Sequence, residues 1–125
     1  MDTRSKILTV DALHALAGPL TVVTGYFDVL RAEHARELES IRRETGAQTL
    51  VALVLPFAGE VFEIRARARM VAALRVVDYV VVADELDANA LLEALHSQTV
   101  IHKEADDARR NHEITEIIQR RQNRP

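Results

Sequence analysis

Four short runs rich in valine and leucine constrain the fold of this chain more than any other feature. They cover residues 20–24, 49–55, 79–83 and 99–102, and apolar and polar residues hardly alternate within them. Parallel strands that are covered by helices on both faces have this composition. We therefore predict an α/β fold, a three-layer α/β/α Rossmann-like sandwich with a mainly parallel sheet of four to five strands.

The segments around these runs have the apolar spacing of helices. Apolar residues recur every three or four positions in residues 10–16 and 30–41, as one buried helix face requires. The elements alternate from a first helix to a last one, an order that predicts right-handed crossovers. Further helices are expected over residues 62–75, 88–96 and 107–121.

Local signals mark the ends of these helices. Thr9 is expected to cap the first helix, which Gly18 and Pro19 end. Gly46 is placed as a glycine beyond the C-terminus of the second helix, and Asp87 is expected to cap the fourth. These are the residue types that helix ends favour.

The composition limits the class of protein. With 125 residues and 48% hydrophobic content, the chain suits one domain, 1–125. The net charge is −3 and acidic and basic residues are interleaved, so we expect no binding to nucleic acid. The absence of cysteine fits a reducing, cytoplasmic setting. The first residues, MDTRSKILTV, lack the apolar run of a signal peptide, and we expect no membrane association because no run of about 18 apolar residues occurs.

The junction after the first of these runs is the strongest candidate site. From Gly25 the chain reads G-Y-F-D-V-L-R-A-E-H, and a helix is expected from about Arg31. A helix that starts after a parallel strand directs unpaired backbone N–H groups, and the positive end of its dipole, at one point. Phosphates bind at such points. The sequence therefore predicts a phosphate site here.

The junction also resembles the motif G-x-F-D-x-L-H-x-G-H of the cytidylyltransferase-like nucleotidyltransferases. This family includes glycerol-phosphate cytidylyltransferases and heptose-phosphate adenylyltransferases. Arg31 stands where the family has the first histidine, and Glu33 stands where it has glycine. The positions that match are Gly25, Phe27, Asp28, Leu30 and His34.

Three later segments resemble the same family. The segment from Arg67, R-A-R-M-V-A-A-L-R-V-V-D-Y-V, is similar to R-A-x-V-L-A-A-L-R-x-V-D-Y-V. The segment from Val100, V-I-H-K-E-A-D, is similar to V-x-V-K-G-x-D, and E-I-T-E-I-I from Glu113 resembles the helix start that closes over the phosphates. The strand that the family has between the last two segments has no counterpart. The likeness thus covers most of the chain, with an abbreviated C-terminal part.

The resemblance implies a set of site residues. His34 and Arg31 take the places of the two histidines that stabilise the charge on the reacting phosphates, and Lys103 takes that of a family lysine, so these three are the catalytic candidates. The implied ligand is ATP or CTP with magnesium, together with a sugar or polyol phosphate. No metal site is expected in the protein itself, because the histidines lack metal-ligand spacing. The implied nucleotide-binding residues are Gly25, Tyr26, Phe27, Asp28, Arg67 and Thr115.

Carboxylates occupy several positions where the triphosphate would lie. Glu33 and Glu104 replace glycines of the family pattern, and Glu113 replaces a hydroxyl residue. Two like charges about 4 Å apart repel by roughly 4 kcal/mol at an effective dielectric constant near 20. The sequence therefore indicates a phosphate site that has fewer positive groups than the family pattern and carries negative groups at several of its positions.

Several of these residues also have a structural interpretation. His34 shares a helix face with Leu38, and we favour packing against the sheet over ligand contact. For Asp28, a functional role and the capping of nearby N–H groups are equally supported. Arg36, Arg42 and Arg43 lie among glutamates and are expected on a solvated helix face.

The sequence leaves three possibilities open for the function. The first is a pseudoenzyme of the nucleotidyltransferase fold, with lost or much reduced catalysis, that acts as a binding or dimerisation module. The alternative is an active adenylyl- or cytidylyltransferase in which Arg31 and His34 share the work of the two histidines. A ligand of different charge, cationic or neutral, is a third possibility.

The loop before the third helix suggests a partner surface. Phe57, Val61, Phe62 and Ile64 fall in residues 57–64, where the family has basic residues and this chain has none before Arg65. Exposed apolar clusters mark interaction surfaces. We therefore expect a homodimer.

Overall fold

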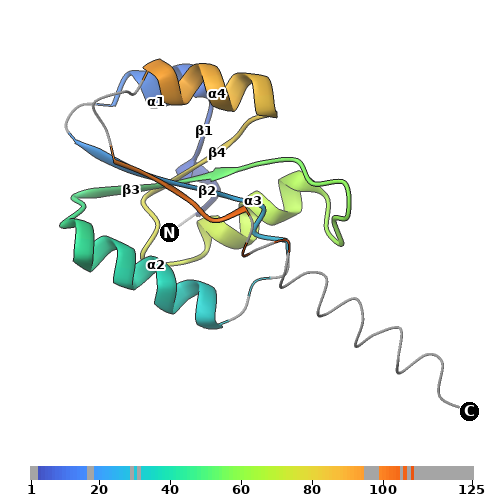
Figure 1. Ribbon diagram of the computed structural model, residues 1–125, viewed down its shortest axis with the longest axis horizontal. Helices are drawn as coiled ribbons and strands as arrows, with labels where there is room; N and C mark the ends of the chain where they lie inside the picture. Colours follow the sequence, from blue (N-terminus) through green and yellow to red (C-terminus); the bar gives the residue numbers. More distant parts are fainter. Residues whose placement is uncertain are drawn as a thin grey trace, which may run out of the picture.

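The computed structural model describes residues 3–16, 19–28, 30, 32–94, 99–104, 106 and 108. Helices and strands alternate along the chain, after a short 3₁₀ helix at the start (Figure 1). The elements are η1 (Thr3–Lys6), β1 (Ile7–Leu8), α1 (Val10–His14), β2 (Leu20–Gly25), α2 (Ala32–Thr45), β3 (Thr49–Val54), α3 (Ile64–Ala72), β4 (Tyr79–Val82), α4 (Glu85–Ala94) and β5 (Thr99–His102).

The five strands form one parallel sheet in the order β1-β4-β3-β2-β5. The register pairs Leu20 with Thr49 and Thr24 with His102, so β2 lies between β3 and β5. Helices α1 and α4 cover one face, and α2 and α3 cover the other (Figure 1). This arrangement confirms the predicted three-layer Rossmann-like class.

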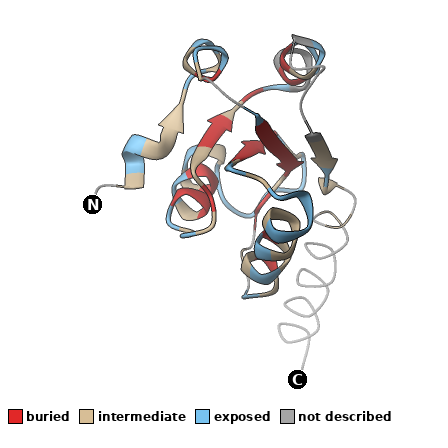
Figure 2. Cartoon of the chain, turned by 90° about the vertical axis from the view of Figure 1, so that its left-hand side faces the viewer, coloured by how far each residue is buried: buried red, intermediate tan, exposed pale blue. Residues whose placement is uncertain are grey.

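The sheet is buried on both faces, as its apolar strands require. Alternate residues of each strand contribute to two core clusters. Val23 and Ala52 pack toward Leu38 of α2 and Val71 of α3, whereas Val22 and its neighbours pack toward α1 and α4. In Figure 2 the central strands are buried, and the helices that flank them carry exposed residues on their outer surfaces. Within the described part of the chain, no helix is long and apolar enough to span a membrane.

Strand β1 was not expected from the sequence. Ile7 and Leu8 pair with Val80 and Val81 at the edge of the sheet, next to β4. A strand of two residues carries too little pattern to be distinguished from the start of the helix that follows. The predicted N-cap of that helix is confirmed, because the Thr9 side chain accepts a hydrogen bond from Ala12 N–H at 3.1 Å.

The helix ends differ in detail from those expected. Gly46 has a φ of 65° directly after α2, as its predicted role requires. Asp87 lies inside α4, so the predicted cap was wrong. Helix α3 is shorter than expected because Glu63 caps it, accepting a hydrogen bond from Ala66 N–H at 3.0 Å. Gly18 and most of the predicted helix over 107–121 lie outside the described residues.

Arg42 connects helix α2 to the amino ends of the strands. Its guanidinium donates hydrogen bonds to the carbonyl oxygens of Val76 at 2.7 Å and Gln48 at 3.0 Å, and to the Asp78 carboxylate at 2.8 Å. The same Asp78 oxygen accepts a hydrogen bond from Leu50 N–H at 2.8 Å. The prediction of a solvated face was wrong for Arg42, because tertiary packing places carbonyl acceptors within its reach.

Candidate functional site

The strand order indicates where a ligand site is expected in this fold. The chain runs from β2 to β3 on one side, whereas β5 lies on the other side of β2. In open α/β sheets, ligands bind at the carboxyl ends of the strands where the order reverses in this way. Lys103 N–H donates a hydrogen bond to the Thr24 carbonyl at 2.8 Å, which joins the two strand ends. The G-Y-F-D turn and Lys103 therefore meet at the expected place.

The turn after β2 directs Asp28 toward a distant loop. Phe27 is buried and has a φ of 49°, a left-handed backbone conformation that costs a residue with a side chain roughly 1–2 kcal/mol. The buried Asp28 carboxylate then accepts hydrogen bonds from the backbone N–H groups of Val61 and of Phe62, the latter at 2.8 Å. Asp28 thus holds the loop between β3 and α3, residues 55–63.

Arg67 holds the same loop from the other side. Its side chain is fully buried in α3 and donates hydrogen bonds to three carbonyl oxygens, those of Tyr26 at 2.7 Å, Leu55 at 2.8 Å and Phe62 at 3.1 Å. A fourth bond, at 2.6 Å, joins it to the Glu60 carboxylate. Charge-assisted hydrogen bonds of this kind are the strong ones. All three guanidinium nitrogens of Arg67 are therefore engaged within the protein.

A pair of aromatic rings completes the support of the 55–63 loop. Tyr26 and Phe57 stack with ring centroids 4.4 Å apart and planes 20° from parallel. Beyond them, Val61 is 53% exposed and Phe62 is 43% exposed. The expected surface position is confirmed for these two residues, whereas Phe57 and Ile64 are half-buried. The loop thus presents two apolar side chains to solvent while its backbone is tied down.

The α2 side of the site holds mixed charges. Lys103 and Glu33 line one shallow hollow with Arg36 and Glu37. The Lys103 ammonium group lies 2.7 Å from the carboxylate of Asp106 and 3.8 Å from that of Glu37. Acidic groups therefore surround the amine that the resemblance assigned to catalysis.

His34 is buried in the first turn of α2, on the same side as Leu38. This position agrees with the favoured interpretation, in which His34 packs between the helix and the sheet. Its burial leaves little of the ring available to a ligand in solution.

The α4 side of the site is a separate cavity of about 210 Å³. It is lined by Thr24, His102, Glu104 and Asn89, with Leu55 and Leu92 among its apolar walls. Thr24 Oγ1 and His102 Nδ1 are hydrogen-bonded at 2.8 Å, and one Glu104 oxygen lies 3.8 Å from the same ring nitrogen. The other oxygen, Oε1, is buried and has no hydrogen-bond partner within the described part of the chain. A buried carboxylate oxygen favours a hydrogen-bond donor and disfavours an anion.

The structure brings together part of the predicted site. Gly25, Tyr26 and Asp28 contact Arg67 or the loop that it holds, and Lys103 lies at the same sheet edge. Arg31 and Thr115 lie outside the described residues. In those described ranges, no group of three histidines or carboxylates is placed to hold a metal ion.

Two features of this edge were missed from the sequence. Glu60 is the partner of Arg67, and Thr24 pairs with His102. A signal for the burial of Arg67 was present, because it shares a helix face with Val71, four residues later. The Thr24–His102 pair depends on the register of β2 and β5, which local sequence does not encode.

Comparison with solved structures shows a structural likeness to a known protein. The chain is similar to the crystal structure of the lipopolysaccharide core biosynthesis protein from Thermoplasma volcanium GSS1, with a TM-score of 0.49 and 16% sequence identity. The match covers 67% of this chain and 94% of that chain. No protein-family model matches the sequence, and no curated protein matches it. A likeness of this extent carries no statement about activity.

Proposed function

We propose that this chain is a pseudoenzyme with a nucleotidyltransferase-like fold, which has lost most or all catalysis and acts as a binding and dimerisation module. The observation that carries this proposal is that Asp28 and Arg67 form hydrogen bonds within the protein. Both stand at positions that the resemblance assigns to the nucleotide, and both bind the 55–63 loop that presents Val61 and Phe62.

The engaged cations support the loss of phosphate binding. Arg67 would have to give up carbonyl and carboxylate partners to reach a phosphate. Removing a buried charge from such partners is strongly unfavourable, by about 3–5 kcal/mol in measured cases. Lys103 is paired with Asp106 at 2.7 Å. Neither residue offers the uncommitted positive charge that a triphosphate requires.

The carboxylates support the same conclusion. Glu33 and Glu37 share the α2-side hollow with Lys103, and Glu104 lines the α4-side cavity with a buried carboxylate oxygen that accepts no hydrogen bond from the described residues. A triphosphate at either place would add negative charge beside existing negative charge, at a repulsion of several kcal/mol. Hydrogen-bond donors and cations are better suited to both places.

The 55–63 loop is suited to an apolar partner surface. Aromatic and large aliphatic side chains at the centre of an interface supply most of its affinity. Because the loop backbone is held by Asp28 and Arg67, little conformational entropy remains to be lost on binding. Proteins of the family that the sequence resembles are often dimers, and we propose a second copy of this chain as the partner.

The oligomeric state tests the dimerisation part. Sedimentation velocity of the native chain is expected to give a dimer, and the double variant Val61→Ser, Phe62→Ser is expected to give a monomer whose circular dichroism spectrum matches that of the native chain. Ala90→Ser changes an exposed residue of α4 and serves as the matched control. A native chain that stays monomeric at high concentration would contradict the proposed dimer.

Nucleotide titration tests the loss of catalysis. Calorimetry with ATP or CTP and magnesium is expected to show no binding by the native chain and measurable binding by Glu33→Gly. Glu39→Gly, at an exposed position of the same helix, controls for the helix loosening of about 1 kcal/mol that glycine causes. Micromolar binding by the native chain, followed by turnover of a sugar phosphate, would instead favour the active transferase.

A further inference from the structure

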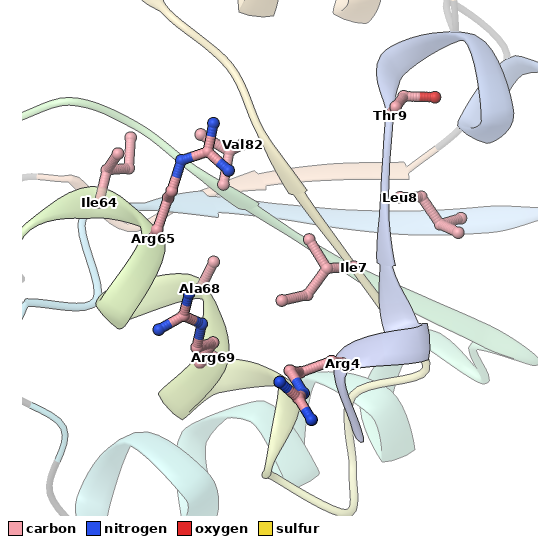
Figure 3. A pocket seen from close by; sticks show the side chains of 9 residues that line it. All are labelled: Arg4, Ile7, Leu8, Thr9, Ile64, Arg65, Ala68, Arg69 and Val82. Carbon is pink, nitrogen blue, oxygen red and sulfur yellow. The ribbon is translucent and has the colours of Figure 1, made fainter. Parts of the chain in front are cut away.

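A second hollow lies at the opposite edge of the sheet from β5. It has a volume of about 450 Å³ and lies between the η1–β1 segment and α3 (Figure 3). Small-molecule sites commonly have volumes of about 300–1,000 Å³. We call it the arginine hollow, and the residues that define it are Arg4, Ile7, Ile64, Arg65, Ala68 and Arg69.

Three arginines form the rim of the arginine hollow. Arg4 comes from η1, and Arg65 and Arg69 come from successive turns of α3, more than sixty residues later in the chain (Figure 3). The guanidinium groups of Arg65 and Arg69 are exposed, and neither forms a hydrogen bond or an ion pair within the described residues. The fold therefore gathers positive charge here in a protein whose net charge is −3.

The placement of these charges opposes the stability of α3. Arg65 lies in the first turn, where the helix dipole disfavours a cation. Arg65 and Arg69 are four residues apart, so their like charges repel each other. An anion between them would relieve both effects, because guanidinium groups bind carboxylate and phosphate oxygens in pairs.

The floor of the arginine hollow is apolar. Ile7 projects between the arginines in Figure 3, and Ala68 is buried beneath them. Ile64 and Val82 continue the apolar surface toward the carboxyl end of the sheet. A ligand that satisfies both rim and floor needs an anionic head and an apolar body.

From this juxtaposition we propose that the arginine hollow binds a small amphipathic anion, a carboxylate or phosphate carried on an apolar chain or ring. The hollow is lined by η1, β1, β4 and α3 and shares no lining residue with the cavities at the β2–β5 edge. The proposal is therefore independent of nucleotide binding at those cavities.

Titration of the full chain with simple amphiphiles tests this proposal. Octanoate and octyl phosphate are followed by backbone amide chemical shifts in NMR spectra, beside octanol, acetate and inorganic phosphate. At least one amphiphilic anion is expected to shift amides of η1, β1 and α3 saturably and more weakly at high salt. The one that binds more tightly identifies the head group. Octanol, acetate and phosphate are expected to bind at least tenfold more weakly.

Charge variants separate the arginine hollow from general surface binding. The double variant Arg65→Gln, Arg69→Gln is expected to lose tenfold or more in affinity for the tighter amphiphile. Arg75→Gln removes one charge at an exposed position just beyond α3 and outside the hollow, and is expected to change the affinity less than twofold. Equal losses in both variants would overturn the proposal. So would saturable binding of octanol with the affinity of octanoate, or no saturable shift with either amphiphilic anion.

Discussion

The two sides of helix α3 use the same residue type for opposite purposes. Arg67 faces inward, is fully buried and donates four hydrogen bonds to the surrounding chain. Arg65 and Arg69, two positions away on either side, face outward into the arginine hollow without described partners. Identical side chains in the run R-A-R-A-R thus divide into a structural support and a candidate binding surface.

This difference follows from the geometry of the helix. A step of two residues turns the helix by about 200°, so Arg67 projects away from both of its arginine neighbours. On the inner side, the residues that directly follow β2 and β3 supply carbonyl oxygens at hydrogen-bonding distance. On the outer side, the described segment across the arginine hollow is η1–β1. The environment, and not the residue type, therefore decides the role of each arginine.

The largest expected effect is the loss of the inward arginine. Arg67→Met keeps an apolar stem but leaves the carbonyl oxygens of Tyr26, Leu55 and Phe62 without their donor. We expect the free energy of unfolding to fall by about 3–5 kcal/mol, measured by urea denaturation. A loss below about 1 kcal/mol would show that water replaces the guanidinium at little cost. Arg67 would then differ little in structural role from Arg65 and Arg69.

A smaller loss is expected at the other support of the 55–63 loop. Asp28→Ala leaves the N–H groups of Val61 and Phe62 without their acceptor, close to the surface. We expect a destabilisation of about 2 kcal/mol, together with faster amide exchange in the loop. Asp28→Asn, which retains one acceptor oxygen, is expected to lose less. Equal stability of the alanine variant and the native chain would contradict this account.

Lys6 attaches the η1–β1 segment, which borders the arginine hollow, to the chain beyond α3. Its ammonium group donates hydrogen bonds to the carbonyl oxygens of Val77 at 2.9 Å and Leu74 at 3.2 Å, just beyond the end of α3. Lys6→Met is expected to cost about 1 kcal/mol and to loosen the η1–β1 segment, as measured by hydrogen exchange of the Ile7 and Leu8 amides. Unchanged exchange there would mean that pairing with β4 alone holds β1.

The smallest effect is expected for the outward arginines. Arg65→Gln and Arg69→Gln are each expected to change the free energy of unfolding by less than about 0.5 kcal/mol, because exposed substitutions away from special contacts have this range. A slight gain in stability is the expected direction, since one of two like charges is removed. A loss of 1 kcal/mol or more in thermal or urea unfolding would assign these side chains a structural role.

Much of the fold was predictable because the signals are local. The four valine-rich runs became β2 to β5, and Thr9 and Gly46 have the predicted helix-end conformations. Strand β1 was not predictable, because two residues at a sheet edge depend on pairing with β4, more than seventy positions later. The later start of α3 has a local cause: the Glu63 side chain caps the helix by accepting a hydrogen bond from Ala66 N–H.

The candidate site was predictable in position and less so in role. Resemblance selected Asp28, Arg67 and Lys103, and the fold places all three at the sheet edge that includes the ends of β2 and β5. It could not select Glu60 as the partner of Arg67, because that contact requires the 55–63 loop to close over the helix. Neither could it show that Arg42 bonds to three separate groups at the amino ends of the strands.

The sequence by itself determined the layers of this protein, because apolar runs and helical spacing act over a few residues and survive in any context that buries them. It also determined which charged groups are present, including Glu33 and Glu104 at positions where the family that it resembles has glycine. Only the tertiary structure decided which charges are engaged. Arg67 is enclosed by backbone carbonyls and Arg69 is not, since hydrogen-bond partners come from segments that folding brings together.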